Sequence, residues 1–214
     1  MVERVSWVDA STGASGDLLL GALVDAGVPI GVMAEAVEKV ATGDLYEERV
    51  DRGGVAATCC RVDVEDVPEP RSWREIEVLL AGAGLHEEVR SLAHDVFARL
   101  AEEESRVLGL PAEDARFSDV GSPQAVAEVV GVCAGVAHLR VRRLVVSADP
   151  AGLELSTPIG AALLTALADE WGPQPAMTVS DTGVGAASGD AERPVLRLSV
   201  GESEPGRHEK LGES

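Results

Sequence analysis

The chain of 214 residues is 45% hydrophobic and carries 37 acidic against 18 basic side chains, a formal net charge of −19. Its length suits one well-cored domain, and its apolar content excludes a disordered chain. The acidic balance argues against a nucleic-acid or anionic-membrane surface, because phosphate binding needs clustered lysine and arginine.

The first half of the chain should begin with a strand, a loop and a helix and continue through a hairpin into helices. Apolar spacing, capping residues and glycine turns predict the boundaries. In chain order we expect a strand at 5–9, helices at 15–26 and 30–40, hairpin strands at 45–50 and 56–64, and helices at 72–83 and 86–108.

The second half alternates helices and short strands. We expect, in order, a helix at 122–138, a strand at 144–147, a helix at 157–171, and strands at 178–180 and 195–200. This mixture predicts an α+β or α/β fold with strands at both ends of the chain and a central helical segment. One compact domain should cover residues 1–201, and residues 202–214 should be a charged, disordered tail.

Cysteine usage and the N-terminus favour an intracellular protein. The adjacent Cys59 and Cys60 and one further cysteine form neither a disulfide framework nor a metal motif, and the pair is expected to be small apolar filler. The first residues are not typical of a signal peptide, and the longest apolar run, 129–137, is too short to cross a bilayer. We therefore expect a cytoplasmic location.

The loop between the first strand and helix concentrates serine, threonine, glycine and aspartate. A strand, a small-residue loop and a helix start can present backbone N–H groups to an anion. Gly13 and Gly16 would let a ligand approach the backbone, Ser15 is a candidate N-cap, and Asp17 complements the helix dipole. The loop lacks the lysine of a phosphate-binding P-loop, so a capped helix start is the alternative. Asp9, at the strand end, favours a ligand site.

Eight motifs extend this pattern along the chain. They lie at residues 5–23, 71–76, 96–104, 117–121, 129–134, 156–164, 171–175 and 184–186. In order and spacing they resemble the LarC family, whose members insert nickel into the pincer cofactor of lactate racemase and related enzymes. The resemblance runs to about Gly201 and implies nickel insertion, with nickel and CTP as the small molecules used.

The chain departs from the family pattern at its histidines. Glu69, Pro70, Arg116 and Ser118 stand at family histidine positions. Gln124 replaces a family acid, although Glu128 retains a carboxylate. Some forty family residues have no counterpart between 147 and 153, and the separate C-terminal domain tied to CTP is not matched.

Histidine loss bears on metal binding, because imidazole is the natural side-chain ligand of nickel(II), whereas carboxylates alone favour harder cations. The remaining histidines are His86, His94, His138 and His208. None is paired with another at metal-ligand spacing, and we expect solvated or helix-capping roles for them. We accordingly predict no metal-ligating residues.

Carboxylates and hydroxyls remain as candidates for chemistry. The candidate catalytic residues are Asp9, Asp17 and Asp119. The candidate ligand-binding residues are Ser11, Thr12, Gly13, Ser15, Gly16, Ser118, Ser156 and Thr157. Asp9 or Asp119 could act as a general base or bind a cation if burial shifts its pKa. In the alternative interpretation, all of these residues only cap helices and complete turns.

Three hypotheses follow. The first is a shortened nickel insertion protein that acts on a small-molecule substrate, alone, as a homo-oligomer or with a partner supplying the missing domain. The second is a repurposed scaffold, a metal-independent cyclase or lyase of a biosynthetic pathway. The third is a non-catalytic protein that binds a true family member. Resemblance places the first ahead.

Overall fold

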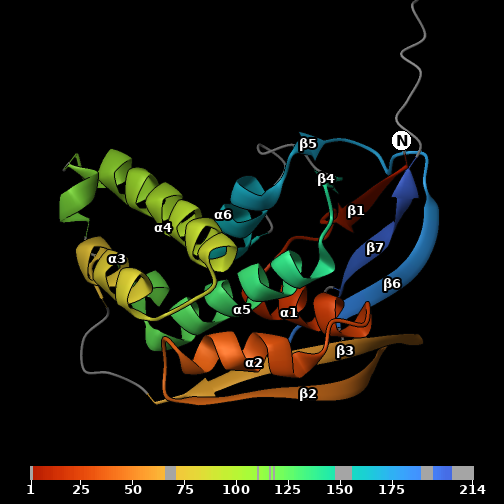
Figure 1. Cartoon of the computed structure of the whole chain (residues 1–214), viewed down its shortest axis with the longest axis horizontal. Coiled ribbons are helices and arrows are strands. Elements are labelled where there is room, and N and C mark those ends of the chain that lie inside the picture. Colours follow the sequence, from red (N-terminus) through yellow and green to blue (C-terminus); the bar gives the residue numbers. More distant parts are fainter. Residues whose placement is uncertain are drawn as a thin grey trace, which may run out of the picture.

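The strands expected at both ends of the chain meet in one mixed sheet (Figure 1). The computed structural model describes residues 2–65, 71–109, 111–115, 117, 119–147, 156–188 and 195–203. The strand order is β2 (Gly43–Arg52), β3 (Val55–Val64), β6 (Thr178–Ala186), β7 (Val195–Ser203), β1 (Glu3–Asp9), β4 (Arg143–Val146) and β5 (Glu170–Trp171). The pairs β1/β4, β4/β5 and β3/β6 are parallel, and the other neighbours are antiparallel.

The helices form where the sequence predicted them, and side-chain caps explain the starts of α3, α5 and α6. They are α1 (Gly16–Asp25), α2 (Ile30–Glu38), α3 (Trp73–Gly82), α4 (Glu87–Leu108), α5 (Pro123–Leu139) and α6 (Pro158–Leu167), with 3-10 turns η1 (Ala112–Asp114) and η2 (Asp119–Gly121). Ser72 and Glu75 form a reciprocal capping box at α3. Ser122 and Thr157 cap α5 and α6, each followed by a proline at the first helical position. The predicted fold class, a single mixed domain, is confirmed.

Two predicted elements differ most from the observed bounds. The helix predicted at 157–171 ends at Leu167, because Asp169 exchanges two hydrogen bonds with Leu144 and brings the chain beside β4. The strand predicted at 178–180 continues to Ala186 through Gly183 and Gly185. Glycine lowers the strand propensity of this segment, so its length was underestimated.

Helix α1 lies between the sheet and α5 (Figure 1). Its backbone touches the strands directly, because Gly21 faces the Thr58 carbonyl of β3, and Gly185 faces the Leu18 carbonyl. A Cβ atom at either glycine would overlap the opposing oxygen. Gly183 makes the same kind of approach to Ala22. These glycines set how closely α1 packs on the sheet.

Asp25 anchors the C-terminal end of α1 to two strands. Its carboxylate accepts hydrogen bonds from the Thr58 hydroxyl at 3.0 Å and from the Val184 N–H at 2.7 Å, and it pairs with Arg49. The side chain is only 11% exposed, so these bonds satisfy a carboxylate that water scarcely reaches.

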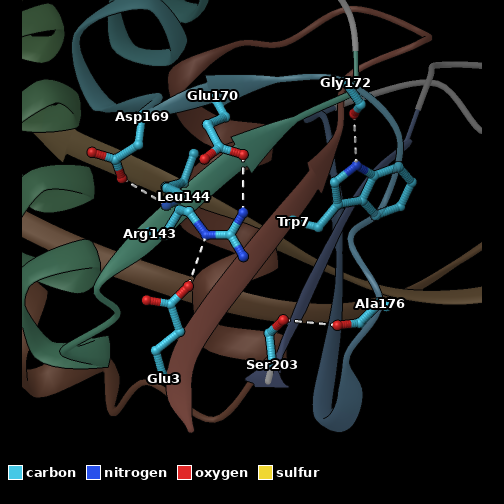
Figure 2. A network of polar contacts seen from close by, with 9 residues as sticks. All are labelled: Glu3, Trp7, Arg143, Leu144, Asp169, Glu170, Gly172, Ala176 and Ser203. Atoms are coloured by element: carbon cyan, nitrogen blue, oxygen red, sulfur yellow. Dashed lines mark hydrogen bonds and ion pairs between the residues drawn. The ribbon is translucent and has the colours of Figure 1, made fainter. Parts of the chain in front are cut away.

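The face of the sheet opposite α1 is tied together by a second polar network (Figure 2). Arg143 of β4 reaches Glu3 of β1 at 3.1 Å and Glu170 of β5 at 2.9 Å. The Trp7 indole donates to the Gly172 carbonyl at 3.3 Å. The hydroxyl of Ser203 donates to Ala176 at 2.8 Å. The segment after β5 is thereby held to β1 and β7.

The structure also bears on the expectations for the cysteines, for membrane-spanning helices and for the end of the domain. Cys59 and Cys60 are both buried, as predicted, and burial raises the pKa of Cys60 to about 12. Among the described residues, no helix combines the length and apolar character needed to cross a membrane. Strand β7 ends at Ser203, two residues beyond the predicted domain boundary, and the rest of the predicted tail lies outside the described residues.

Replacing Gly185 with alanine should destabilise the fold by about 3 kcal/mol or more, because the new Cβ forces α1 away from β6. Gly31→Ala is the matched control: it lies on α2 with open space around the added methyl, and it should be neutral or stabilising by up to about 1 kcal/mol. Urea unfolding of both variants measures the difference. Equal stabilities would show that the close approach of α1 does not constrain the fold.

Candidate functional site

The loop from Ala10 to Ser15 is braced by hydroxyls from distant parts of the chain. The Ala10 N–H donates to Ser147 at the end of β4, and the Ala14 N–H donates to Ser156 before α6, each at 2.9 Å. The Thr157 N–H donates to the Ala14 carbonyl, also at 2.9 Å. The two ends of the loop are therefore fixed to β4 and α6.

Two more N–H groups of the loop are used locally. Ser11 donates to the Asp9 carboxylate at 3.1 Å, and Gly13, at φ 95°, donates to the Ala10 carbonyl at 2.9 Å. The Thr12 hydroxyl donates to the Val195 carbonyl of β7 at 2.8 Å. With the Ala10 and Ala14 donors also satisfied, at most the N–H groups of Thr12 and of the helix start remain for a ligand.

Asp9 is the last residue of β1. Its carboxylate accepts from Ser11 and, at 3.3 Å, from the hydroxyl of Ser147. Burial alone would raise the pKa of Asp9. The hydrogen bonds from Ser11 and Ser147, together with the charge of Arg197, outweigh burial and lower that pKa. Asp9 is therefore held as a carboxylate, which is suited to binding a cation or orienting the loop.

Asp17 is the carboxylate at the start of α1. One of its oxygens accepts from the Ser15 hydroxyl and from the Leu18 N–H, the latter at 2.9 Å. The other accepts from the N–H of Ser188, just after β6, at 3.2 Å. Ser15 occupies the N-cap position as predicted, but its hydroxyl is directed to Asp17 and makes no capping bond.

Glu128 of α5 completes this end of α1, although sequence reasoning noted it only as a retained carboxylate. Gly16 leaves room for it: a Cβ atom there would overlap the Glu128 carboxylate. Gln124 donates to Glu128 at 3.1 Å. Burial raises the pKa of Glu128 to about 7, the Gln124 bond offsets part of the rise, and the charge of Asp17 adds to it. The sequence signal that could have identified Glu128 is that it is the one acidic residue in a mostly apolar helix.

The remaining candidate residues lie apart from Asp17 and Glu128, the two carboxylates at the start of α1. Asp119 is exposed on η2, before α5, and within the described residues it makes no recorded contact with the loop. Ser118 falls outside the described residues. Thr157 caps α6 by accepting from the Gly160 N–H at 3.0 Å. No contact is recorded between the carboxylates of Asp9 and Asp17, which belong to different ends of the loop.

Histidines do not gather at this site. In the part of the chain that the structure describes, no three histidine, cysteine or acidic side chains are grouped to hold a metal ion. His94 stacks on Trp73 with ring centroids 5.1 Å apart. His86 and His138 both line a surface pocket of about 290 Å³ between α2, α4 and α5. His208 lies outside the described residues.

Comparison with known proteins gives a consistent description. A family model described as "Nickel insertion protein" matches residues 6–153 and 148–213. The pyridinium-3,5-bisthiocarboxylic acid mononucleotide nickel insertion protein of Nocardioides sp. (strain ATCC BAA-499 / JS614) is 46% identical over 92% of this chain and 59% of its own length. Proteins whose names also refer to nickel insertion occur in Syntrophobacter fumaroxidans, 35% identical over 95% of this chain and 62% of the relative, and in Thermomicrobium roseum, 37% over 94% and 58%. No solved structure gives a significant match.

The chain spans about three fifths of the length of these curated relatives. The alignment with the Nocardioides protein covers 233 positions, more than the 214 residues here, so positions of the relative lack a counterpart. The two pieces of the family match meet at 148–153. The sequence analysis expected the missing family residues at this same place, between 147 and 153.

Glu128→Gln should stabilise the protein at pH 8 by about 1–3 kcal/mol. The pKa of Glu128 is raised from 4.5 to about 7 by the fold, so the neutral form suits the native state and stability is lost as pH rises through that interval. The advantage of the variant should therefore shrink at pH 5.5. Urea unfolding at both pH values measures it. Glu102→Gln, exposed on α4, is the control, and a pH-independent gap would show that Glu128 titrates normally.

Proposed function

The chain belongs to the nickel insertion protein family, and on that premise we propose that it takes part in inserting nickel into a pyridinium-3,5-bisthiocarboxylic acid mononucleotide. The observation that carries the proposal is the family match along nearly the whole chain. The substrate is the one named for the Nocardioides relative. The named relatives give no support to a repurposed cyclase or lyase, or to a non-catalytic partner.

We assign the handling of nickel to the Asp17–Glu128 pair at the start of α1. Nickel is cargo here, so a site that holds it weakly suits transfer better than one that retains it. Carboxylates are hard ligands and bind nickel(II) less well than sulfur or imidazole do. Two carboxylates could hold the ion until the two thiocarboxylate sulfurs of the substrate take it over.

Glu128 also suits the proton balance of the reaction. Ligands must lose their protons to bind a metal, so nickel would displace the proton of Glu128 to solvent when it binds. With a pKa of about 7 in the absence of metal, Glu128 is near half-protonated in neutral solution and can exchange that proton for the cation, then take a proton up again when the ion leaves. Asp17 would be held in position beside the cation by its hydrogen bonds from Ser15 and Ser188.

Other candidates have supporting roles in this proposal. Asp9 and the hydroxyls of Ser11 and Thr12 would fix the loop that precedes Asp17. Asp119, exposed on η2 and apart from the loop, is given no role in nickel transfer. CTP use, a cytoplasmic location and a partner or second copy that completes the activity enter the proposal only through the family resemblance.

Asp17→Asn should lower nickel incorporation at least about tenfold, because the cation loses its permanent charge partner, while the fold loses about 1 kcal/mol or less. Asp9→Asn should lower incorporation less, because it changes only the loop support. The assay follows nickel bound to the bisthiocarboxylate mononucleotide by mass spectrometry, with CTP present and the Nocardioides protein as positive control. Wild-type activity in Asp17→Asn would remove this residue from the site, and no incorporation by the unsubstituted chain would overturn the function.

Nickel alone should bind only weakly, with a dissociation constant above about 1 μM, equivalent to less than about 8 kcal/mol of binding free energy. The reason is that the pair offers two carboxylates and no imidazole. Calorimetric titration of the protein with Ni²⁺ measures this directly. A stoichiometric sub-micromolar site would mean that the protein stores nickel with a ligand set other than Asp17 and Glu128.

A further inference from the structure

Arg71 is half-buried and holds one atom of its guanidinium away from water. This atom, Nη1, is shut off from solvent and has no hydrogen-bond partner. Within the described part of the chain, the side chain makes no hydrogen bond or ion pair. A buried donor without a partner is costly, so Nη1 needs an explanation outside the fold's own contacts.

The backbone holds Arg71 firmly in place. Its N–H donates to the Gly121 carbonyl of η2 at 2.9 Å. Gly121 in turn has no side chain, which lets the Arg71 carbonyl approach it closely. The backbone of Arg71 is thus fixed against the turn that precedes α5.

Arg71 lines a polar pocket of about 300 Å³. The pocket lies between the end of α2, the residue after β3 and the start of α5, and its other polar or charged walls come from Glu38, Lys39, Thr42 and Glu65. Lys39 is already paired with Glu35 at 3.0 Å. Arg71 is therefore the cation of this pocket that forms no direct ion pair with a described side chain, although the carboxylates of Glu38 and Glu65 share the pocket wall.

The guanidinium of Arg71 indicates which class of ligand the pocket would bind. Guanidinium presents a planar fork of donors that matches a phosphate or carboxylate, and the pocket volume is at the small end of the range for small-molecule sites.

We propose that the Arg71 pocket binds the phosphate group of a nucleotide ligand. The inference rests on the proposed function, in which the substrate is a mononucleotide. The same phosphate chemistry could come from the substrate or from a nucleoside triphosphate. Binding of phosphate to Arg71 is measured without nickel, so it stands or falls separately from nickel transfer.

The test compares Arg71→Met with Arg74→Met, an exposed arginine three residues along on α3. Methionine keeps the apolar stem and removes the charge. The probes are nicotinic acid mononucleotide, its riboside without phosphate, and CTP, each titrated by calorimetry. We expect at least a tenfold loss of affinity for a phosphate-bearing probe in Arg71→Met only, with no effect on the riboside. The probe that shows the loss identifies the source of the phosphate.

Thermal unfolding separates this role from a structural one. An unpaired guanidinium contributes little to the fold, so Arg71→Met should melt at or above the wild-type temperature. If Arg71 instead serves the C-terminal dipole of α2, the variant should melt several degrees lower and keep its affinity for every probe. That result overturns the proposal, as does an equal loss in Arg74→Met or the absence of phosphate-probe binding by wild type up to about 10 mM.

Discussion

The close approach of α1 to the sheet is the constraint on which the rest of the structure depends. Glycines at 21, 183 and 185 allow backbone to meet backbone, and the acids at the two ends of the helix accept hydrogen bonds from two N–H groups near the C-terminal end of β6. Asp25 accepts a hydrogen bond from the Val184 N–H, and Asp17 accepts one from the Ser188 N–H. Because α5 packs on the other side of α1, this fixed helix also decides where Glu128 meets Gly16.

Local signals were enough to predict most of the fold. Capping serine and threonine followed by Glu75, Pro123 or Pro158 marked helix starts, and alternation marked the hairpin. The error at the end of α6 came from a contact between distant residues. Asp169 ends α6 early because it bonds Leu144, and that partner is invisible in a window of neighbouring sequence.

Distant contacts also explain why the candidate site could be predicted only in part. The acids and hydroxyls of residues 9–17 could be identified from composition and position. Their pairing could not, because Ser147 and Ser156, which satisfy the loop, are more than 130 residues from the groups they bind. Glu128 and Arg71 needed the structure as well, since only tertiary packing shows that a carboxylate is buried beside Gly16 or that a guanidinium lacks a partner.

The two serines that brace the loop stand on either side of the break in the family match. Ser147 is held by β4 and Ser156 lies next to α6, so each anchor is placed by its own element and neither depends on the connection between them. A segment inserted or removed between the two serines would therefore leave both anchors in place. The junction is where we expect a change in chain length to be tolerated without moving the loop.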